Sequence, residues 1–237
     1  WALLTLSGYF QYAHVPMVVR DFCNRYLPVH YNPYRQADSL DLTPLYADNF
    51  DVDMQWKAPQ GALSALVPGL TLAYGTTFHG SYNYAEALKL VFRSDSVVYN
   101  GISVNDLGFN TVTLGENYQL RAKAGSFNVG GSPLLDNVYL DAGLGSRIST
   151  LSLRWDDDAA TVNTEGDLEF FLTSSPSDNK LLITKPTFYA MGQRWTMVCP
   201  DGILFNRDRL SVDNLKVYGL GQSASPKAYV AGNEGDY

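Results

Sequence analysis

LLDNVYL at Leu134–Leu140 and SVDNLKVY at Ser211–Tyr218 indicate the fold class of this 237-residue chain. Each stretch alternates apolar with polar residues around an Asp-Asn step, and this period-2 pattern is typical of a half-buried strand. GLGQSASP at Gly219–Pro226 follows the second stretch and is rich in residues that interrupt secondary structure. We therefore expect both stretches to be strands, the second of which closes a β-sandwich.

The alternating pattern recurs through residues 62–220, which we expect to form one β-domain. Gly, Asn, Asp and Ser separate the candidate strands at roughly 8–12-residue intervals, and no helical pattern lies between them. This spacing predicts an all-β fold, namely an antiparallel β-sandwich of jelly-roll type. The expected strands are Leu70–Phe78, Ala87–Phe92, Ser96–Val104, Asn117–Ala124, Asn137–Ala142, Ile148–Trp155, Leu168–Thr173, Leu181–Ile183, Arg194–Cys199, Gly202–Phe205 and Ser211–Tyr218.

Residues 1–61 differ from the rest of the chain in composition and in the spacing of apolar residues, and they are predicted to form an N-terminal arm. Apolar residues at helical spacing predict a short helix over residues 17–27, which Pro28 ends. From Pro28 to Pro59, prolines alternate with aromatic and acidic residues, a composition that disfavours both a central strand and a solvated linker. We expect an extended segment that packs on its own domain or on a neighbouring subunit. Residues 221–237 are expected to be a polar C-terminal tail.

The composition excludes several classes of partner. A net charge of −7 argues against binding nucleic acid, because Lys and Arg supply most of the affinity for phosphates. No run of about 18 apolar residues occurs, so neither a transmembrane helix nor membrane insertion is expected. The start at Trp1 does not read as an intact signal peptide, which indicates a processed or partial chain.

Two cysteines, Cys23 and Cys199, are too few for a disulfide framework, and neither stands at metal-ligand spacing from a His or a second Cys. We expect two unpaired and mostly buried thiols. A long-range bridge between them is the alternative, which only spatial proximity can decide.

Four stretches, in this order, resemble strands of jelly-roll carbohydrate-binding modules. They are GSYNYAEALKLVF at 80–92, LGENYQLRAKA at 114–124, QRWTMV at 193–198 and VDNLKVY at 212–218. The resemblance covers residues 70–219 and implies a β-sandwich with a glycan-binding role. It also implies that Asp213, on the last strand, helps to bind a structural calcium ion. Viral capsid, decoration and fibre proteins use the same architecture.

Four aromatic residues near loops or strand ends are candidates for binding a glycan: Tyr82, Tyr84, Tyr99 and Trp155. An exposed ring can stack on the apolar face of a pyranose. The alternative is that each ring packs between strands, because sheets favour aromatic residues in any case.

Candidate calcium ligands are Asp156 and Asp158, in the acidic triplet that follows Trp155, together with Asp213. Clustered carboxylates suit Ca²⁺, although no calcium-loop spacing follows the triplet. The alternatives are a solvated loop tip for the triplet and backbone hydrogen bonding for Asp213. No other cofactor is expected.

An enzyme is the weakest of the interpretations. Glu165, Asp167 and Glu169 could supply the two carboxylates of a glycoside hydrolase or lyase, and a polar outer strand face explains them equally. The three histidines are scattered and none lies beside an activated Ser or Cys, and phosphate-loop and dinucleotide motifs are absent. We therefore expect no catalysis.

Two non-catalytic roles remain. The first is a structural component of an extracellular assembly, most plausibly a phage or virus particle, in which the arm joins copies of the chain into a homo-oligomer. The second is a carbohydrate-binding module of a secreted or surface protein, with polysaccharide as its partner. Both roles predict a virion or extracellular location.

Overall fold

The computed structural model describes residues 2–26, 48–57, 67–85, 87–114, 117–156, 164–175, 178–190, 192–206, 209–212, 214–219, 222–224 and 228–231. In these ranges the chain forms a 17-stranded sheet, one short 3-10 helix, η1 (Tyr12–His14), and one α-helix, α1 (Val15–Tyr26). Every strand pair is antiparallel. The prediction of a mainly antiparallel all-β fold is confirmed.

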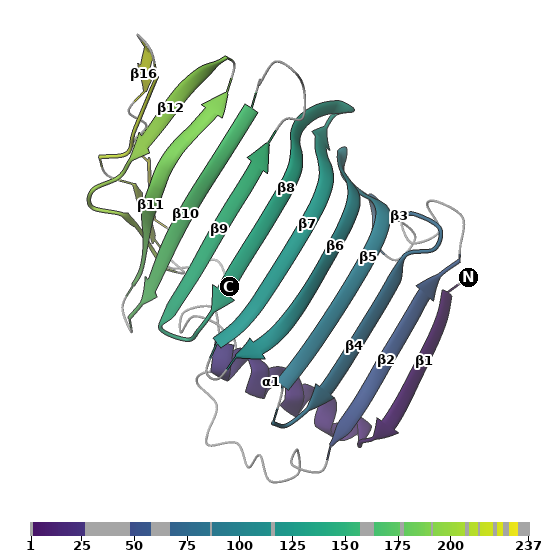
Figure 1. The fold of residues 1–237 in the computed structure, drawn as a ribbon. Helices are drawn as coiled ribbons and strands as arrows, with labels where there is room; N and C mark the ends of the chain where they lie inside the picture. Colours follow the sequence, from purple (N-terminus) through teal and green to yellow (C-terminus); the bar gives the residue numbers. More distant parts are fainter. Residues whose placement is uncertain are drawn as a thin grey trace.

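Ten long strands lie side by side in chain order (Figure 1). They are β1 (Ala2–Tyr9), β2 (Asn49–Trp56), β4 (Thr77–Asn83), β5 (Ala87–Tyr99), β6 (Ile102–Leu114), β7 (Asn117–Val129), β8 (Ser132–Leu144), β9 (Ile148–Asp156), β10 (Thr164–Ser174) and β11 (Asn179–Ala190).

Seven shorter strands complete the sheet. β3 (Leu70–Leu72) pairs with the C-terminal part of β5. Beyond β11 the sheet divides into two branches, one through β12 (Gln193–Val198), β15 (Lys216–Gly219) and β16 (Gln222–Ala224), and the other through β13 (Ile203–Phe205), β14 (Arg209–Val212) and β17 (Ala228–Ala231).

The jelly-roll type is not confirmed. In the described ranges the long strands pair with their neighbours in sequence and belong to one curved sheet. A jelly roll would place two sheets face to face and connect strands across them. The period-2 pattern shows that one face of each strand avoids water, and it does not show what covers that face.

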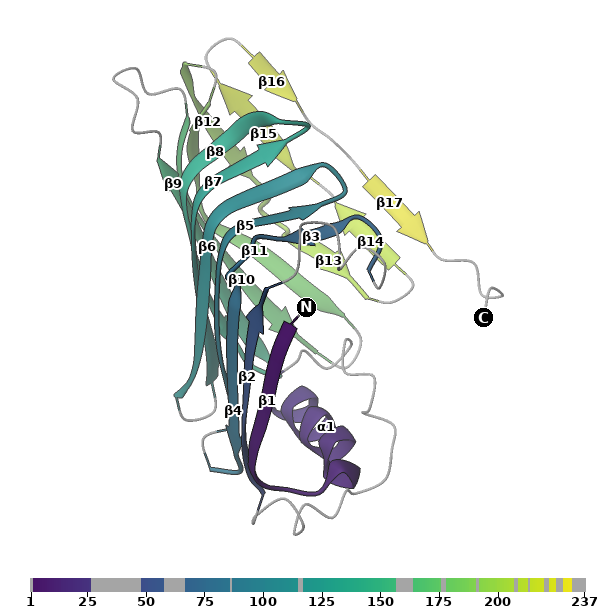
Figure 2. The ribbon, with the colours of Figure 1, turned by 90° about the vertical axis from the view of Figure 1, so that its right-hand side faces the viewer.

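Helix α1 lies on the concave side of the sheet (Figure 2). The helix predicted over residues 17–27 is confirmed over Val15–Tyr26. Its apolar residues recur at helical spacing, so that Val18 packs against Tyr82 of β4 and Tyr26 against Tyr118 of β7.

The segment predicted to be an arm contributes strands to the same sheet. β1 pairs with β2 along its whole length, and β2 pairs with β4, beyond the expected boundary at residue 62. The proline- and aromatic-rich stretch at 27–47 lies outside the described residues. Cys23 and Cys199 are both buried and are not joined by a disulfide bond, as predicted.

A sharp bend, here called the corner, crosses four neighbouring strands at Asp95, Asp106, Gly125 and Asn137. The strand registers place these residues opposite one another, and none of them belongs to an assigned ladder pair. Asp106 and Asn137 have φ angles of 51° and 45°, in the left-handed region that Asn and Asp tolerate best among non-glycine residues. The part of the sheet beyond the corner, here called the flap, consists of 70–72, 96–105 and 126–136. Figure 2 shows β5–β8 turning toward the concave side there.

The corner changes which residues face inward. Residues three apart in a regular strand point to opposite faces, whereas Val104 and Leu107 line the same cavity. Ala124 and Phe127 do so on β7, and Leu135 and Val138 on β8. One extra residue per strand, as in a β-bulge, therefore keeps the apolar side chains on the concave face on both sides of the corner.

Three strand predictions are wrong in an informative way. Leu70–Phe78 spans the turn at Tyr74 and Gly75 that joins β3 to β4. Ser96–Val104 spans a hairpin turn, because Asn100 and Gly101 both have positive φ and join β5 to β6. Ser211–Tyr218 is divided at Asn214, whose φ of 56° resembles that of Asn137 in the matching phrase. The Asp-Asn step therefore marks a distortion of the strand in both phrases.

Candidate functional site

A row of apolar residues, here called the apolar row, crosses the concave face at right angles to the strands. Each member lies directly opposite the next on the neighbouring strand: Leu4, Met54, Phe78, Phe92, Phe109, Ala122, Leu140, Leu153, Leu168 and Pro186. Nine steps between neighbouring strands span about 43 Å. The row is thus long enough for an extended ligand.

The middle of the apolar row borders a cavity of about 320 Å³ at the corner, here called the corner groove. Its lining residues are Val104, Leu107, Ala122, Lys123, Ala124, Phe127, Leu135, Val138, Leu140 and Leu153. Lys123 is the exception to this apolar set, and its ammonium group lies over the ring of Tyr139, 5.2 Å from the centroid. Most of the lining residues are only half-buried, so apolar surface remains exposed.

The convex face of the same strands is charged. Arg121 Nε donates to Asp141 Oδ2 at 3.2 Å between β7 and β8. Lys185 Nζ lies 3.3 Å from Asp167 Oδ2 and 2.5 Å from Glu169 Oε1. Hydrogen bonds from Lys185 to Glu169 and then Asp167 raise the pKa of its ammonium group. Charge on one face and apolar side chains on the other leave the concave face as the place for an apolar ligand.

Helix α1 covers only one side of the concave face. Val18 packs with Phe50, Tyr82 and Leu88, none of which belongs to the apolar row. Farther along the helix, Phe22 and Tyr26 pack on Tyr118 and Leu144. Tyr118 donates its hydroxyl to Thr111 Oγ1 at 2.7 Å, and burial raises its pKa. The helix therefore closes the concave face on one side of the apolar row and does not cover the row itself. Within the row, Leu168 is only 8% exposed and Phe92 packs against the buried pair of Trp56 and Leu72.

The predicted glycan-binding residues do not gather in one place. Tyr82 is 4% exposed beneath α1, and Trp155 is 8% exposed near the end of β9. Tyr84 is half-buried, with the Arg25 guanidinium 4.7 Å from its ring centroid. Tyr99 is 49% exposed at the end of β5, in the flap. Of the four residues, Tyr99 is the most exposed to solvent.

The predicted metal ligands are only partly within the described ranges. Asp156 is exposed at the end of β9, whereas Asp158 and Asp213 lie outside the described residues. Asp156 shares a cavity of about 350 Å³ with Trp155, Glu165 and Asp167. Among the described residues, no group of three or more His, Cys, Asp or Glu could hold a metal ion.

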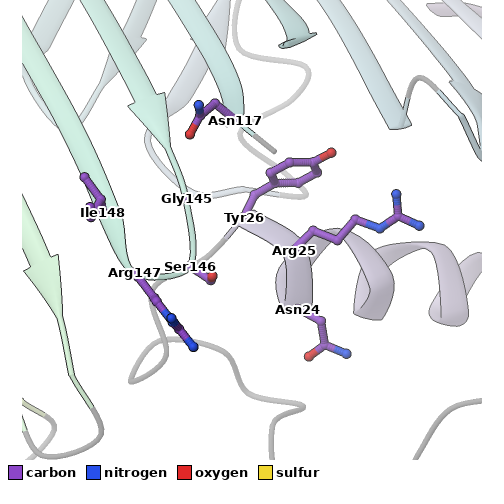
Figure 3. A pocket seen from close by; sticks show the side chains of 8 residues that line it. All are labelled: Asn24, Arg25, Tyr26, Asn117, Gly145, Ser146, Arg147 and Ile148. Carbon is purple, nitrogen blue, oxygen red and sulfur yellow. The ribbon is translucent and has the colours of Figure 1, made fainter. Parts of the chain in front are cut away.

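A polar cavity of about 630 Å³ lies where the C-terminal end of α1 meets the β8–β9 hairpin (Figure 3). Arg25 and Arg147 both line it, which raises the question of an anion site. The side chain of Arg25 is paired with Asp21 at 2.9 Å, and Figure 3 shows that the two guanidinium groups do not converge. This cavity therefore has no focused positive charge.

Sequence reasoning missed the residues of the corner groove. The sequence contains a signal for them, because the spacing of two between apolar residues is interrupted at the corner. On β7, Ala122 and Ala124 are followed by an apolar residue at Phe127 rather than at position 126. The same shift occurs between Leu135 and Val138 on β8. Reading both shifts together could have located the corner.

No family model matches the chain, and no curated protein or solved structure matches it either. No helix in the described ranges is long and apolar enough to cross a membrane.

Proposed function

We propose that the concave face binds an extended apolar chain, such as the acyl chain of a lipid, in the corner groove and along the apolar row. The observation that carries this proposal is the unbroken register of apolar residues from Leu4 to Pro186 across ten strands.

The chemistry of the groove selects the ligand class. A sugar or nucleotide needs several hydrogen-bonding groups, and the side chains that the groove offers are apolar. Lys123 lies two residues after Arg121, so its side chain is on the convex face, where its ammonium group lies over Tyr139. Each methylene group removed from water contributes about 0.8 kcal/mol, so burial of about ten of them contributes about 8 kcal/mol before the cost of ordering the chain. A linear hydrocarbon chain fits this surface without leaving a buried polar group unsatisfied.

The test is a titration with cis-parinaric acid, whose fluorescence rises in apolar surroundings. Ala122→Trp fills the groove between Phe109 and Leu140 and should raise the Kd at least about tenfold. Arg121→Trp adds the same ring on the convex face and should leave the Kd unchanged. Circular dichroism checks that both variants are folded, and Ala122→Leu serves if the tryptophan is not tolerated. Non-saturable fluorescence with the unaltered protein, or equal affinity of Ala122→Trp, would contradict the proposal.

A second candidate function is the predicted structural role in an assembly of copies. It is supported by β1, whose eight residues are all exposed and uncharged and whose single ladder partner in the described ranges is β2. Leu3, Leu4 and Leu6 are 49%, 65% and 40% exposed. Edge strands in monomeric proteins usually carry charges, prolines or bulges that prevent pairing.

We expect light scattering to report an oligomer that Leu4→Lys with Leu6→Lys disrupts, whereas Val91→Lys on the convex face does not. A monomer at all protein concentrations would exclude this role. The virion or extracellular location, glycan binding and the lack of catalysis remain predictions.

A further inference from the structure

The outer edge of the flap presents a second apolar row, here called the tip row. Leu70, Tyr99, Ile102 and Val129 lie opposite one another on β3, β5, β6 and β7. Tyr99, Ile102 and Val129 are 49%, 38% and 47% exposed. Exposed apolar side chains gathered at one edge, unlike single scattered ones, mark a binding surface.

Two further side chains enlarge this surface. Val67, in the turn before β3, is 42% exposed, and Leu134, near the start of β8, is 53% exposed. Figure 2 shows the β5–β6 and β7–β8 hairpins and β3 together on the overhanging side of the sheet.

The hairpin tips contain no charge. Neither residues 96–105 nor residues 124–135 include Asp, Glu, Lys or Arg. On the same strands before the corner, charged residues are frequent, as the pair of Arg121 and Asp141 illustrates. The change from charged to uncharged occurs near the corner, with Asp136, which precedes the corner residue Asn137, as the one charged residue within the ranges that define the flap.

The polar groups of the flap are largely satisfied internally. Gly130 donates its backbone N–H to Gly101 O at 2.9 Å, which joins the two hairpin turns. Asn100 donates its backbone N–H to Gly69 O at 3.2 Å. The side chains of Asn105 and Asn128 donate to Ser126 Oγ at 2.9 and 3.2 Å. A segment that enters a hydrocarbon phase needs this internal pairing, because the phase offers no hydrogen bonds.

We propose that the tip of the flap docks on the surface of a lipid bilayer. Val67, Ile102, Val129 and Leu134 enter the hydrocarbon, and Tyr99 lies at the interface, where its ring is buried and its hydroxyl stays hydrated. The docking is peripheral and involves no membrane-spanning segment.

A bilayer fits this surface better than a second protein does. A stable protein interface buries about 1,000 Å² or more and includes charged and hydrogen-bonding groups at its rim. The tip carries no charged residue at 96–105 or 124–135 and therefore offers no charged rim. Burial of a few aliphatic side chains in hydrocarbon, in contrast, is sufficient for reversible membrane binding.

The tip also connects with the corner groove. The next row inward consists of Leu72, Val97, Val104, Phe127 and Leu135, again in register, and its last three members line the groove. An acyl chain could move from a docked bilayer to the groove along a continuous apolar surface. This connection rests on the proposed function, whereas docking does not.

Flotation with phosphatidylcholine vesicles tests the docking. The unaltered protein should float with the vesicles at both low and high salt, because apolar burial carries the binding. Vesicles rich in phosphatidylglycerol should bind no better, since the chain has a net charge of −7. Failure to float with either kind of vesicle would overturn the proposal, as would binding to phosphatidylglycerol alone that salt abolishes.

Ile102→Asp with Val129→Asp should lower the vesicle partition coefficient at least about tenfold. Each aliphatic side chain that no longer enters the hydrocarbon is expected to lower this coefficient about tenfold or more. The matched control is Val91→Asp with Ile148→Asp, which alters two side chains that are 37% and 53% exposed outside the flap and should bind normally. If the first variant does not fold, Ile102→Ser with Val129→Ser replaces it.

Equal flotation of the tip variant and the control would contradict docking through the tip. If the tip variant instead abolishes a dimer seen by light scattering while flotation is unaffected, the tip binds a second copy and the proposal is wrong. The two proposals fail separately: Ala122→Trp should keep vesicle binding and lose cis-parinaric acid, whereas the tip variant should do the reverse.

Discussion

The indole ring of Trp155 lies against the backbone of Gly166, its cross-strand partner on β10. A Cβ atom at position 166 would overlap ring atoms Cη2, Cζ2 and Cε2 of Trp155. Because Trp155 is 8% exposed, its ring has little room to move away. The absence of a side chain at Gly166 is thus what lets the indole pack on the sheet.

We expect Gly166→Ala to lower the free energy of unfolding by about 2 kcal/mol, as overpacking in a core does. The control is Gly108→Ala on β6, where the nearest atom to a new Cβ is Phe92 O at 3.7 Å. That substitution should change the free energy of unfolding by less than about 0.5 kcal/mol. Urea denaturation of both variants measures the difference, and equal midpoints would show that the Trp155 ring can shift.

The corner depends on Asn137, whose φ is 45°. Asn137→Ala should cost about 1 kcal/mol, because a Cβ without a compensating side-chain amide disfavours the left-handed region. Asn137→Gly should cost less than about 0.5 kcal/mol, because glycine adopts this conformation freely. Thermal unfolding distinguishes the two variants, and the opposite order would mean that the side chain of Asn137, not its backbone, supports the corner.

Tyr82 has no hydrogen-bond partner for its buried hydroxyl among the described residues. An unsatisfied buried hydroxyl costs about 1–3 kcal/mol, so Tyr82→Phe should raise the free energy of unfolding, by about 1 kcal/mol. The control is Tyr118→Phe, which should lower it by about 1 kcal/mol because the bond to Thr111 is lost.

Comparison of the unaltered protein with Tyr82→Phe also tests how stability depends on pH. Burial raises the pKa of Tyr82 to about 12 from its ordinary value of 10. Below pH 10 the phenol is protonated in both states, and between pH 10 and about 12 only the unfolded chain readily loses the proton. The free energy of unfolding should therefore fall by up to about 2–3 kcal/mol over this window. Tyr82→Phe should lose this part of the decline, and an identical decline in both proteins would contradict the assignment.

Two histidine–aspartate pairs differ mainly in burial. His14 Nδ1 lies 2.6 Å from Asp48 Oδ2, with side chains 15% and 2% exposed. His79 Nδ1 lies 2.8 Å from Asp53 Oδ1, with side chains 45% and 61% exposed. His14→Ala leaves a buried carboxylate without this partner and should lower the free energy of unfolding by about 3 kcal/mol. His79→Ala should lower it by less than about 1 kcal/mol. Guanidinium denaturation compares them, and similar losses would mean that Asp48 finds another partner when His14 is removed.

Local pattern was enough to predict several elements. The strand expected at Ile148–Trp155 is β9, and the helix expected over residues 17–27 is α1. In both cases the apolar residues keep one spacing along the whole element, and the element ends near turn-forming residues or a proline.

Two features could not be predicted from local pattern. The sequence predicts an arm that includes β1 and β2, because prolines and aromatic residues dominate the stretch between them. Strand pairing is decided instead by long-range register, which local pattern does not contain. The corner is not predicted, because Asp106 and Gly125 are of residue types that ordinarily end strands, and the expected strands Ser96–Val104 and Asn117–Ala124 end just before them. Their common alignment across neighbouring strands exists only in three dimensions, and so does the groove that they create.

The order of the long strands has a consequence for how such a chain can evolve. Since each long strand borders its neighbours in sequence, the sheet grows in one dimension, much as repeat proteins do. Duplication of one hairpin, such as β7 with β8, would lengthen the apolar surface by about 10 Å and leave the remaining strand pairs as they are. Natural variants of different length would then differ in the length of apolar ligand that the proposed site accepts rather than in the ligand's chemical class.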